Sequence, residues 1–285
     1  MTRREAVLGA MVRLRDQQVP SPLNDAREML AHIIGIPVME MRLNSGAAVT
    51  PEQQRAFDAA VEQRLERMPL QYILGDQPFL NADIRVQPGV LIPRQDTESV
   101  CEYAIEKLKG MVKKELRALD LCCGTGCIGI AMAINVPRIR VTGTDIDEGC
   151  IALSRKNAQR NSVSDYMEFI CGDLFGAVEK GQKFDLIVSN PPYIPRGELE
   201  GLDKEVIGYE PRLALDGGED GFDCYSKIIA EAPGHLFIGG YLVLEAGDRQ
   251  AARLSEMLRS AGFDRVEIFP DVAGNPRGVA GVWRG

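Results

Sequence analysis

The sequence is poor in histidine and lacks both long apolar runs and the cysteine spacing of zinc sites. His32 and His235 are its only histidines. Cys122, Cys123 and Cys127 do not form a C-x-x-C pair, so no metal site is expected. No run of 18 apolar residues and no apolar signal core occur, so we expect neither a membrane span nor a secretory signal. Seven cysteines, an odd number, indicate reduced thiols in a cytoplasmic protein.

Basic residues are also scarce where a nucleic-acid-binding protein would need them. The net charge is −8, and residues 196–223 contain nine acidic and three basic residues. A protein that binds a phosphate backbone normally has an excess of basic over acidic residues, so direct nucleic-acid binding is not expected. The alternative is that the acidic surface only aids solubility.

The chain divides into three predicted regions. In residues 1–70, apolar residues recur at helical spacing and Thr50-Pro51 marks a helix start, which predicts a helical bundle. The bundle carries no cluster of titratable residues and is typical of a docking module. Residues 71–95 contain the short extended pieces "QPFL", "ADIRVQ" and "GVLIP", which predict a strand-rich connector or hairpin.

In residues 96–285, a helix beginning near Asp96 is followed by alternating apolar strands and helices. This alternation predicts a parallel sheet covered on both faces. The last two strands, "RVEIFP" and "GVAGVWR", have no helix between them and predict an antiparallel hairpin. The expected fold is α/β: a doubly wound, mostly parallel sheet with a C-terminal antiparallel hairpin, plus a small N-terminal helical domain.

A glycine-rich turn follows the first strand of this sheet. The strand "RALDLCC" leads into Gly124-Thr125-Gly126, at the edge where open parallel sheets bind ligands. With Gly129, the turn matches the dinucleotide fingerprint, and Asp145 ends the next strand near the position of a ribose-binding acid. NAD and S-adenosylmethionine both offer ribose hydroxyls to one carboxylate. The turn therefore predicts a nucleoside cofactor without deciding which one.

Asp173 and Leu174 follow the third strand, "MEFICG". The Asp173 carboxylate can accept a hydrogen bond from an adenine amino group, and Leu174 can pack against the ring. An isolated Gly-Asp pair is more often a turn. Because the pair lies in the series of strand ends, we interpret it as part of the cofactor site.

The most specific motif is Asn190-Pro191-Pro192-Tyr193, which follows the strand "FDLIVS". Two prolines remove two N–H donors and leave nearby carbonyls free to accept hydrogen bonds. Together with the Asn190 carbonyl they can hold both N–H groups of a planar amide or base amino group, while the Tyr193 ring offers a face for stacking. Fixing both N–H bonds aims a weakly nucleophilic nitrogen at a methyl donor, and no histidine base is needed. The alternative is an ordinary Asn-Pro turn.

These motifs resemble those of the protein-glutamine methyltransferases that modify peptide chain release factors. The resemblance extends from Pro69 to Trp283 and rests on "SNPPYIP", "PLQYILG", "PGVLIPRQDTE" and "YEPRLALDGGEDGFD". The last motif favours the release-factor group over the related enzymes that methylate a ribosomal-protein glutamine. The resemblance implies a class I methyltransferase-like domain over residues 96–285. Residues 1–70, helical and charge-balanced and without a catalytic cluster, are expected to dock the protein substrate.

The resemblance also implies roles for individual residues. Asn190, Pro191 and Tyr193 are expected to be catalytic, and with Pro192 they are expected to bind the glutamine amide. S-adenosylmethionine is expected to contact Cys122, Cys123, Gly124, Thr125, Gly126, Asp145, Asp173, Leu174 and Asn190. The sequence departs from the family at two places: Cys122 replaces a glycine, and Gln95-Asp96 replace a Pro-Glu pair. We expect the Cβ of Cys122 to narrow the cofactor loop.

Three other function classes are compatible with parts of this pattern. An amino-methyltransferase for adenine or guanine uses the same Asn-Pro-Pro-aromatic motif, but the acidic segment after the motif speaks against a nucleic-acid substrate. A nicotinamide oxidoreductase would leave the Asn190–Tyr193 motif unexplained. A non-catalytic nucleoside-binding protein would be excluded by turnover.

Overall fold

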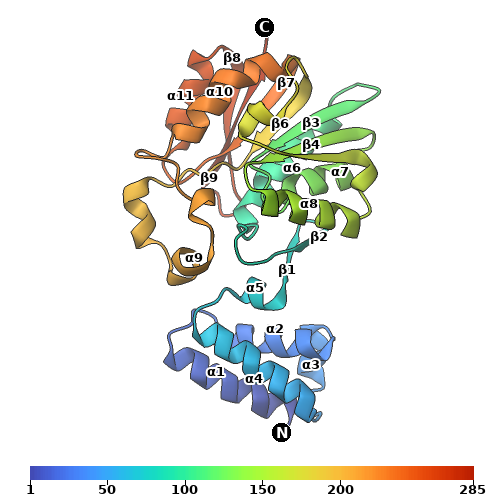
Figure 1. Ribbon diagram of the computed structural model, residues 1–285, viewed down its shortest axis with the longest axis vertical. Coiled ribbons are helices and arrows are strands. Elements are labelled where there is room, and N and C mark those ends of the chain that lie inside the picture. Colours follow the sequence, from blue (N-terminus) through green and yellow to red (C-terminus); the bar gives the residue numbers. More distant parts are fainter. The chain divides into compact units, whose positions relative to one another are not determined.

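The structure is a computed structural model that describes all of residues 1–285. The chain forms two compact units, each shown in Figure 1. Residues 1–76 and 203–209 form the first, here called the helical unit, and residues 77–202 and 210–285 form the second, the sheet unit. The sequence had not indicated that residues 203–209 leave the second unit to join the first.

The helical unit is built from six helices. They are α1 (Arg3–Asp16), α2 (Pro22–Ile34), α3 (Val38–Leu43), α4 (Pro51–Leu65), α5 (Leu70–Leu74) and α9 (Lys204–Tyr209). Local sequence explains where the longer ones begin and end. Thr50 caps α4 by a capping box with Gln53, and α2 ends at Gly35, whose φ of +78° favours glycine.

An ion pair from the buried Arg64 links residues 203–209 to the rest of this unit. Arg64 is 3% exposed, and its guanidinium donates to Asp25 at 2.7 Å and to Glu205 at 3.0 Å. Burial raises the pKa of Asp25, and the hydrogen bond from Arg64 opposes that rise. Removing Arg64 would leave the Asp25 charge buried without a partner, at a cost of about 3–5 kcal/mol.

The sheet unit contains a seven-stranded sheet in the order β5-β4-β3-β6-β7-β9-β8. Strands β3 to β7 are parallel, and β9 pairs antiparallel with both β7 and β8. The strands are β3 (Leu116–Leu121), β4 (Ile139–Asp145), β5 (Met167–Cys171), β6 (Phe184–Ser189), β7 (Leu236–Glu245), β8 (Phe263–Pro270) and β9 (Pro276–Trp283). The predicted fold class is confirmed.

Helices cover both faces of this sheet. Helices α6 (Gln95–Lys109), α7 (Cys127–Asn135) and α8 (Glu148–Arg160) lie on one side, and α10 (Asp223–His235) and α11 (Ala251–Ser260) lie on the other (Figure 1). Side chains alternate along β3 accordingly. Leu119 and Leu121 join the core cluster that includes Tyr225 of α10, whereas Asp120 bonds to α7. No helix is long and apolar enough to cross a membrane.

The region between the helical bundle and the main sheet differs in part from the sequence prediction. Strands β1 (Asp76–Phe79) and β2 (Ala82–Arg85) form a two-stranded sheet, as expected of a connector with extended pieces. The piece "GVLIP" is not a strand; Pro88 precedes it and Pro93 ends it, and neither has an N–H to donate to a ladder. Residues 71–74, assigned to the connector, belong to α5. Helix α10 was not predicted, and Pro233 lies inside it.

Short 3₁₀-helices complete the chain. They are η1 (Ser164–Tyr166), η2 (Leu174–Ala177), η3 (Arg196–Gly201) and η4 (Arg212–Ala214). Three of them follow β5 or β6, and they shape the connections at the carboxyl edge of the sheet.

Candidate active site

A cavity of about 350 Å³ lies in the sheet unit, at the carboxyl ends of β3, β4, β5 and β6. Ligands of open parallel sheets bind at this edge. Its walls include seven of the residues predicted from the sequence: Cys122, Gly124, Asp145, Asp173, Leu174, Asn190 and Pro192. The four strands are neighbours in the sheet, which is why segments distant in sequence meet here.

Three predicted cofactor residues lie behind the cavity wall. Cys123 and Thr125 are 5% and 2% exposed. The Cys123 amide donates to the Thr144 carbonyl at 2.9 Å, and the Thr125 carbonyl accepts from Asn157 at 2.9 Å. Gly126 has a φ of +78° where α7 begins. These residues hold the glycine loop in shape from behind and do not line the cavity.

The Asp145 carboxylate is oriented by two backbone amides. Gly124 N donates to its Oδ2 at 2.8 Å, and Asp147 N donates to its Oδ1 at 3.0 Å. Burial raises the pKa of Asp145, while the hydrogen bonds from Asp147 and Gly124 oppose that rise. Each carboxylate oxygen keeps a lone pair, so the group can accept two vicinal hydroxyls. A Cβ on Gly124 would meet no atom within 4 Å, so this stretch of the wall is left open.

The wall after β5 combines an apolar and an acidic side chain. Leu174 is 6% exposed and has a φ of +46°, and the side chain of Asp173 is 63% exposed. Lys227 Nζ lies 3.9 Å from an Asp173 oxygen. Ile146, 53% exposed, also lines the cavity. An apolar surface next to a carboxylate suits an adenine ring with its amino group, so these residues fit S-adenosylmethionine.

Gly129, the third glycine of the fingerprint, serves packing. Its amide donates to the buried Asp120 carboxylate at 2.9 Å, and a Cβ there would lie 3.2 Å from the same carboxylate and 2.9 Å from Met167. Burial raises the pKa of Asp120 to about 7. Because Gly129 lets α7 approach the sheet closely, its place in the fingerprint does not discriminate between NAD and S-adenosylmethionine.

The side-chain amide of Asn190 is oriented by a residue that the sequence did not reveal. Asn190 Nδ2 donates to Thr97 Oγ1 at 3.2 Å. Thr97 lies in the first turn of α6 and is 2% exposed. With its nitrogen engaged, Asn190 can offer its Oδ1 carbonyl to a ligand. Pro191, which follows, is buried, and Pro192 lines the cavity.

Tyr193 is anchored behind the cavity rather than on its wall. Its hydroxyl donates to Glu245 Oε1 at 3.2 Å, and its carbonyl accepts from Gln250 at 2.9 Å. Glu245 ends β7 and is 1% exposed. Burial raises the pKa of Glu245 to about 7, while a hydrogen bond from Thr97, the charge of Arg277 and the hydrogen bond from Tyr193 oppose the rise. Thr97 and Tyr193 therefore share one buried carboxyl group.

A glycine-rich turn packs against the backbone of the motif. Ile194 N donates to Leu215 O at 3.0 Å, and Gly217 N donates to Ile194 O at 2.9 Å. A Cβ on Gly217 would lie 2.7 Å from the Tyr193 backbone, and one on Gly221 would lie 2.4 Å from the Tyr193 carbonyl oxygen. Only glycine fits at these positions, which explains physically why "LDGGEDG" accompanies the Asn-Pro-Pro-Tyr motif.

Two of the sequence motifs also meet through an ion pair. Arg94, in "PGVLIPRQDTE", lies 2.6 Å from Glu210, in "YEPRLALDGGEDGFD". The Glu210 side chain is 1% exposed, and burial raises its pKa while the charge of Arg94 opposes the rise. The pair fixes the start of a segment whose Pro211 and Leu213 line the cavity.

Sequence reasoning missed Thr97 and Glu245. A signal for Glu245 was present, because an acidic residue ends the apolar strand "YLVLE" at the carboxyl edge of the sheet. Thr97 lies within the motif "PGVLIPRQDTE", but a threonine in the first turn of a helix is ordinary, so it was not singled out. Its importance depends on the approach of α6 to the end of β6.

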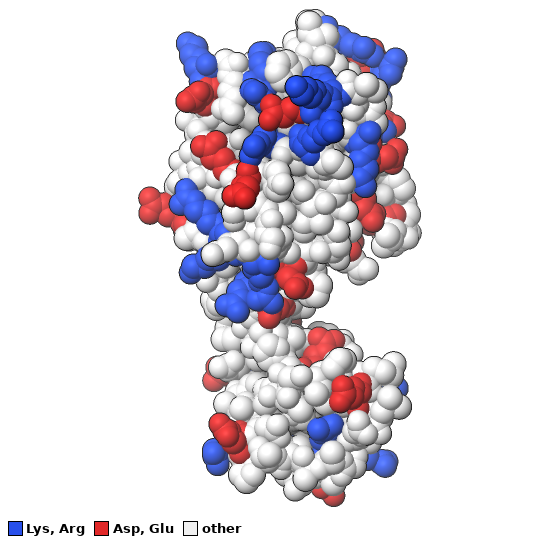
Figure 2. Space-filling model, turned by 90° about the vertical axis from the view of Figure 1, so that its right-hand side faces the viewer, with Lys and Arg blue, Asp and Glu red and all other residues white.

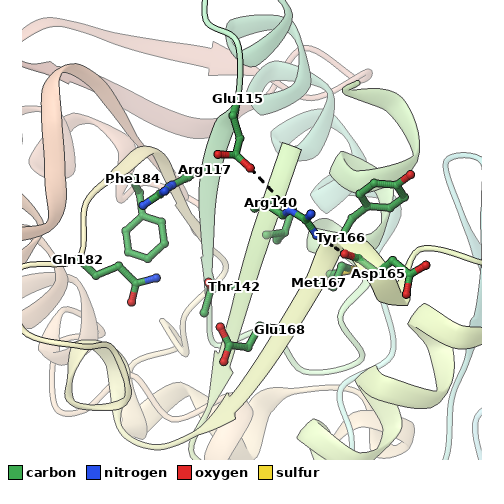
Figure 3. A pocket seen from close by; sticks show the side chains of 11 residues that line it. Glu115, Arg117, Arg140, Thr142, Asp165, Tyr166, Met167, Glu168, Gln182 and Phe184 are labelled. Atoms are coloured by element: carbon green, nitrogen blue, oxygen red, sulfur yellow. Dashed lines mark hydrogen bonds and ion pairs between the residues drawn. The ribbon is translucent and has the colours of Figure 1, made fainter. Parts of the chain in front are cut away.

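A second cavity, of about 300 Å³, lies at the opposite, amino edge of the strands (Figure 3). In it Arg140 pairs with Glu115 at 3.8 Å and points toward the Asp165 backbone. Figure 2 shows Lys and Arg side chains gathered at one end of the sheet unit, with acidic side chains among them. The charges of this cavity are mixed, and none of the predicted site residues reaches it. No group of three or more His, Cys, Asp or Glu side chains is arranged to hold a metal ion.

Comparisons with known proteins agree with this geometry. Residues 94–206 match the family model of the methyltransferase small domain, and residues 5–75 match that of the PrmC N-terminal domain. A release factor glutamine methyltransferase of Geobacter sulfurreducens is 39% identical over 268 residues, which cover 94% of this chain and 92% of that protein. One of Thermodesulfovibrio yellowstonii is 36% identical over 255 residues, covering 90% of each.

Among solved structures, a T. thermophilus 16S rRNA N2 G1207 methyltransferase in complex with AdoMet and guanosine is 18% identical. Its TM-score is 0.54, and the match covers 73% of this chain and 50% of that one. At this identity the likeness supports the class I methyltransferase fold alone. The two relatives match nearly the whole chain at well over 30% identity, which confirms the resemblance inferred from its motifs. The chain belongs to the release factor glutamine methyltransferase family.

Proposed function

We propose that this methyltransferase transfers a methyl group from S-adenosylmethionine to the side-chain amide nitrogen of a glutamine in a peptide chain release factor. The observation that carries the proposal is the orientation of Asn190 by Thr97 at the cavity that also contains Asp145. Such an acceptor beside a nucleoside site suits an –NH₂ group that must be held and aimed.

In this proposal the cofactor lies along the ends of β3, β4 and β5. Asp145 accepts hydrogen bonds from the two ribose hydroxyls, and Gly124 lets the backbone approach the ligand closely. Asp173 accepts from the adenine amino group, while Leu174 packs against the ring. When bound, S-adenosylmethionine supplies an electrophilic methyl group on a sulfonium.

The glutamine amide is held by two acceptors. Asn190 Oδ1 and the Pro191 carbonyl accept hydrogen bonds from its two N–H groups, and the nitrogen then faces the cofactor end of the cavity. Holding a weak nucleophile at a near-attack distance of about 3–3.5 Å can supply much of the rate enhancement. The nitrogen becomes acidic once methylated and releases its proton to water, so no histidine base is required.

Tyr193 supports the amide site through its ring. We expect Tyr193→Phe to retain most activity, because it loses one hydrogen bond to Glu245, worth about 0.5–1.5 kcal/mol. Tyr193→Ala should lose most activity, because the ring is gone. Steady-state methyl incorporation at saturating S-adenosylmethionine measures both. If the phenylalanine variant were as inactive as the alanine variant, the hydroxyl would have a role beyond anchoring.

The helical unit is proposed to dock the release factor. A groove of about 330 Å³ there has an apolar floor that includes Val7 and Met41, and four arginines line it: Arg3, Arg4, Arg27 and Arg42. Arg3 Nε is buried and has no hydrogen-bond partner. An acidic segment of the protein substrate with apolar side chains would complement such a groove.

The acidic residues from Glu198 to Asp223 give a second, opposite complementarity. Residues 198–223 are proposed to meet basic residues around the target glutamine, which would make association sensitive to salt. We expect the protein to act in the cytoplasm on release factors, without direct contact with nucleic acid or membrane and without a metal ion.

The test is incorporation of labelled methyl from S-adenosylmethionine into three acceptors: whole release factor, a peptide containing its target glutamine, and duplex DNA. We expect strong labelling of release factor at one glutamine, weak labelling of the peptide and none of DNA. Replacing that glutamine by alanine should abolish the label. Preferential labelling of DNA would overturn the substrate assignment.

A further inference from the structure

Two cysteines that line the proposed cofactor cavity interact through their side chains. Cys122 follows β3, Cys224 is the second residue of α10, and both line the cavity with Gly124 and Asp145. Their interaction raises the pKa of the Cys122 thiol and lowers that of the Cys224 thiol. No disulfide joins them in this structure, since all seven cysteines are free. The two thiols are thus neighbours from elements about 100 residues apart in sequence.

The backbone at Cys122 makes the presence of a side chain there notable. Its φ is +58°, in the left-handed region that favours glycine. Strained positions of this kind occur preferentially at functional sites, where the side chain has a use. At Cys122 the side chain that occupies the strained position is a thiol that interacts with a second thiol.

Cys224 has the surroundings of a reactive cysteine. Its hydrogen bond with Cys122 lowers its pKa, and the charge of Lys227 acts in the same direction. Burial and the charges of Asp173 and Asp223 oppose this. Cys224 also lies in the first turn of the 13-residue helix α10, where the backbone dipoles favour a thiolate.

The other cysteines lack this combination. Cys101, Cys123, Cys127 and Cys150 are buried, and burial raises the pKa of each thiol. Cys171 is exposed, but its sulfur contacts the Ile146 carbonyl and not another thiol. Cys150 also lines the cavity, but burial raises the pKa of its thiol. A peroxide molecule that enters the cavity therefore meets Cys224 as the more reactive nucleophile and Cys122 as the thiol that interacts with it.

We propose that Cys122 and Cys224 are a redox-sensitive pair, which hydrogen peroxide converts into a disulfide that blocks the cofactor cavity. The proposal rests on the proposed function, because it takes this cavity to be the site of S-adenosylmethionine. A disulfide requires Cα atoms about 4.4–6.8 Å apart and places both sulfurs between them. The bridge would therefore lie in the cavity and hold the loop after β3 against the start of α10.

The chemistry balances with peroxide as the oxidant. The Cys224 thiolate attacks one peroxide oxygen, the O–O bond breaks, and hydroxide leaves, so that Cys224 becomes a sulfenic acid. The Cys122 sulfur then attacks the Cys224 sulfur, the S–O bond breaks, and water leaves with the Cys122 proton. In sum, two thiols and one peroxide give one disulfide and two waters, and a thiol reductant reverses the change.

The same geometry predicts that bound cofactor protects the two cysteines from oxidation. A cofactor in the cavity keeps peroxide away from Cys224 and keeps the loop after β3 away from α10. Because binding and oxidation exclude each other, saturating S-adenosylmethionine should slow formation of the disulfide about tenfold or more.

The experiment uses the purified full-length protein, reduced and then treated with dilute hydrogen peroxide. Mass spectrometry without reduction tests for a peptide pair joined through Cys122 and Cys224, and calorimetry gives the affinity for S-adenosylmethionine. We expect that cross-link, together with at least tenfold weaker binding that dithiothreitol restores. Methionine oxidation would not be reversed by dithiothreitol.

Three variants serve as controls, each compared with itself before and after peroxide. Cys224→Ser and Cys122→Ser should form no cross-link. After peroxide, each should bind S-adenosylmethionine as tightly as it did before treatment. Cys171→Ser, which removes an exposed thiol, should remain as sensitive as the wild type. Absence of the cross-link in wild type, or a cross-link that leaves affinity unchanged, would overturn the proposal. If reduced wild type bound no S-adenosylmethionine, the proposed function would fail, whereas the cross-link would still report on the pair.

Discussion

The two ends of the cavity are held in different ways. At the proposed cofactor end, residues 122–126 and Asp145 are held largely by backbone hydrogen bonds between adjacent strand ends. At the proposed glutamine end, Asn190 and Tyr193 are held by side chains of Thr97, Glu245 and Gln250, which come from three distant segments. The cofactor loop thus depends on contacts with β4 and α8, whereas the amide end joins α6, the end of β7 and the residue before α11 to the segment after β6. Variants at the two ends should separate cofactor binding from catalysis.

The largest expected effect is at the glutamine end. Asn190→Ala should lower kcat by about 100-fold or more, because the amide loses an acceptor that aims its nitrogen. The affinity for S-adenosylmethionine should change only a few-fold, since Asp145 and Gly124 are untouched. Single-turnover methyl transfer and calorimetry measure the two quantities. If kcat and the affinity for S-adenosylmethionine fell by the same factor, the two ends of the cavity would not have separate roles.

At the cofactor end, Asp145→Ala should weaken S-adenosylmethionine binding about tenfold or more. The variant loses charged hydrogen bonds to the ribose hydroxyls, each worth roughly 1.5–3 kcal/mol. At saturating cofactor, kcat should remain within a few-fold of wild type. Asp145→Asn, which keeps the shape of the side chain, is the matched variant. Its affinity for S-adenosylmethionine should lie between those of the wild type and Asp145→Ala. An unchanged affinity in Asp145→Ala would show that the ribose binds elsewhere.

The buried carboxyl group under the amide site should appear in the pH dependence of stability. The pKa of Glu245 is raised to about 7 from an ordinary value of 4.5, so the folded state holds this proton more tightly than the unfolded state. The contribution of Glu245 to stability is therefore full below about pH 4.5 and is lost as pH rises toward 7. Glu245→Gln, which mimics the protonated form, should gain roughly 2 kcal/mol relative to wild type between pH 5 and 7.

Denaturant unfolding of both proteins at several pH values measures this difference. Asp120, whose pKa burial also raises to about 7, is present in both proteins, so its effect cancels in the comparison. A difference that stays constant with pH would mean that Glu245 is ionised throughout the range.

The smallest effect should come from the residue that orients Asn190. Thr97→Val keeps the shape but removes the acceptor for Asn190 Nδ2, a hydrogen bond worth about 0.5–1.5 kcal/mol. We expect kcat to fall several-fold with cofactor affinity unchanged. Thr97→Ser retains the hydroxyl and should restore most of the rate. If serine and valine were equally impaired, Thr97 would act through packing and not through its hydroxyl.

Much of the fold could be predicted from the sequence because its signals are local. Apolar periodicity located α1, α2 and α4. The absence of a helical pattern between β8 and β9 indicated the antiparallel end of the sheet. Helix α10 escaped prediction, since Pro233 interrupts its pattern near the end. The order of the strands was not predicted, because it depends on how the crossovers pack and not on local pattern.

The positions of the strand ends follow from local sequence patterns, and so does the meeting of Asp145, Leu174 and Asn190 at one edge of a parallel sheet. What surrounds these residues depends on contacts that only the folded chain makes. Thr97 reaches Asn190 only because α6 packs beside β6, and Gly217 and Gly221 are needed only because their turn touches the Tyr193 backbone. The thiols of Cys122 and Cys224 are neighbours for the same reason. Periodicity and strand ends are properties of nearby residues, whereas these contacts join segments that only the packed sheet and its helices bring together.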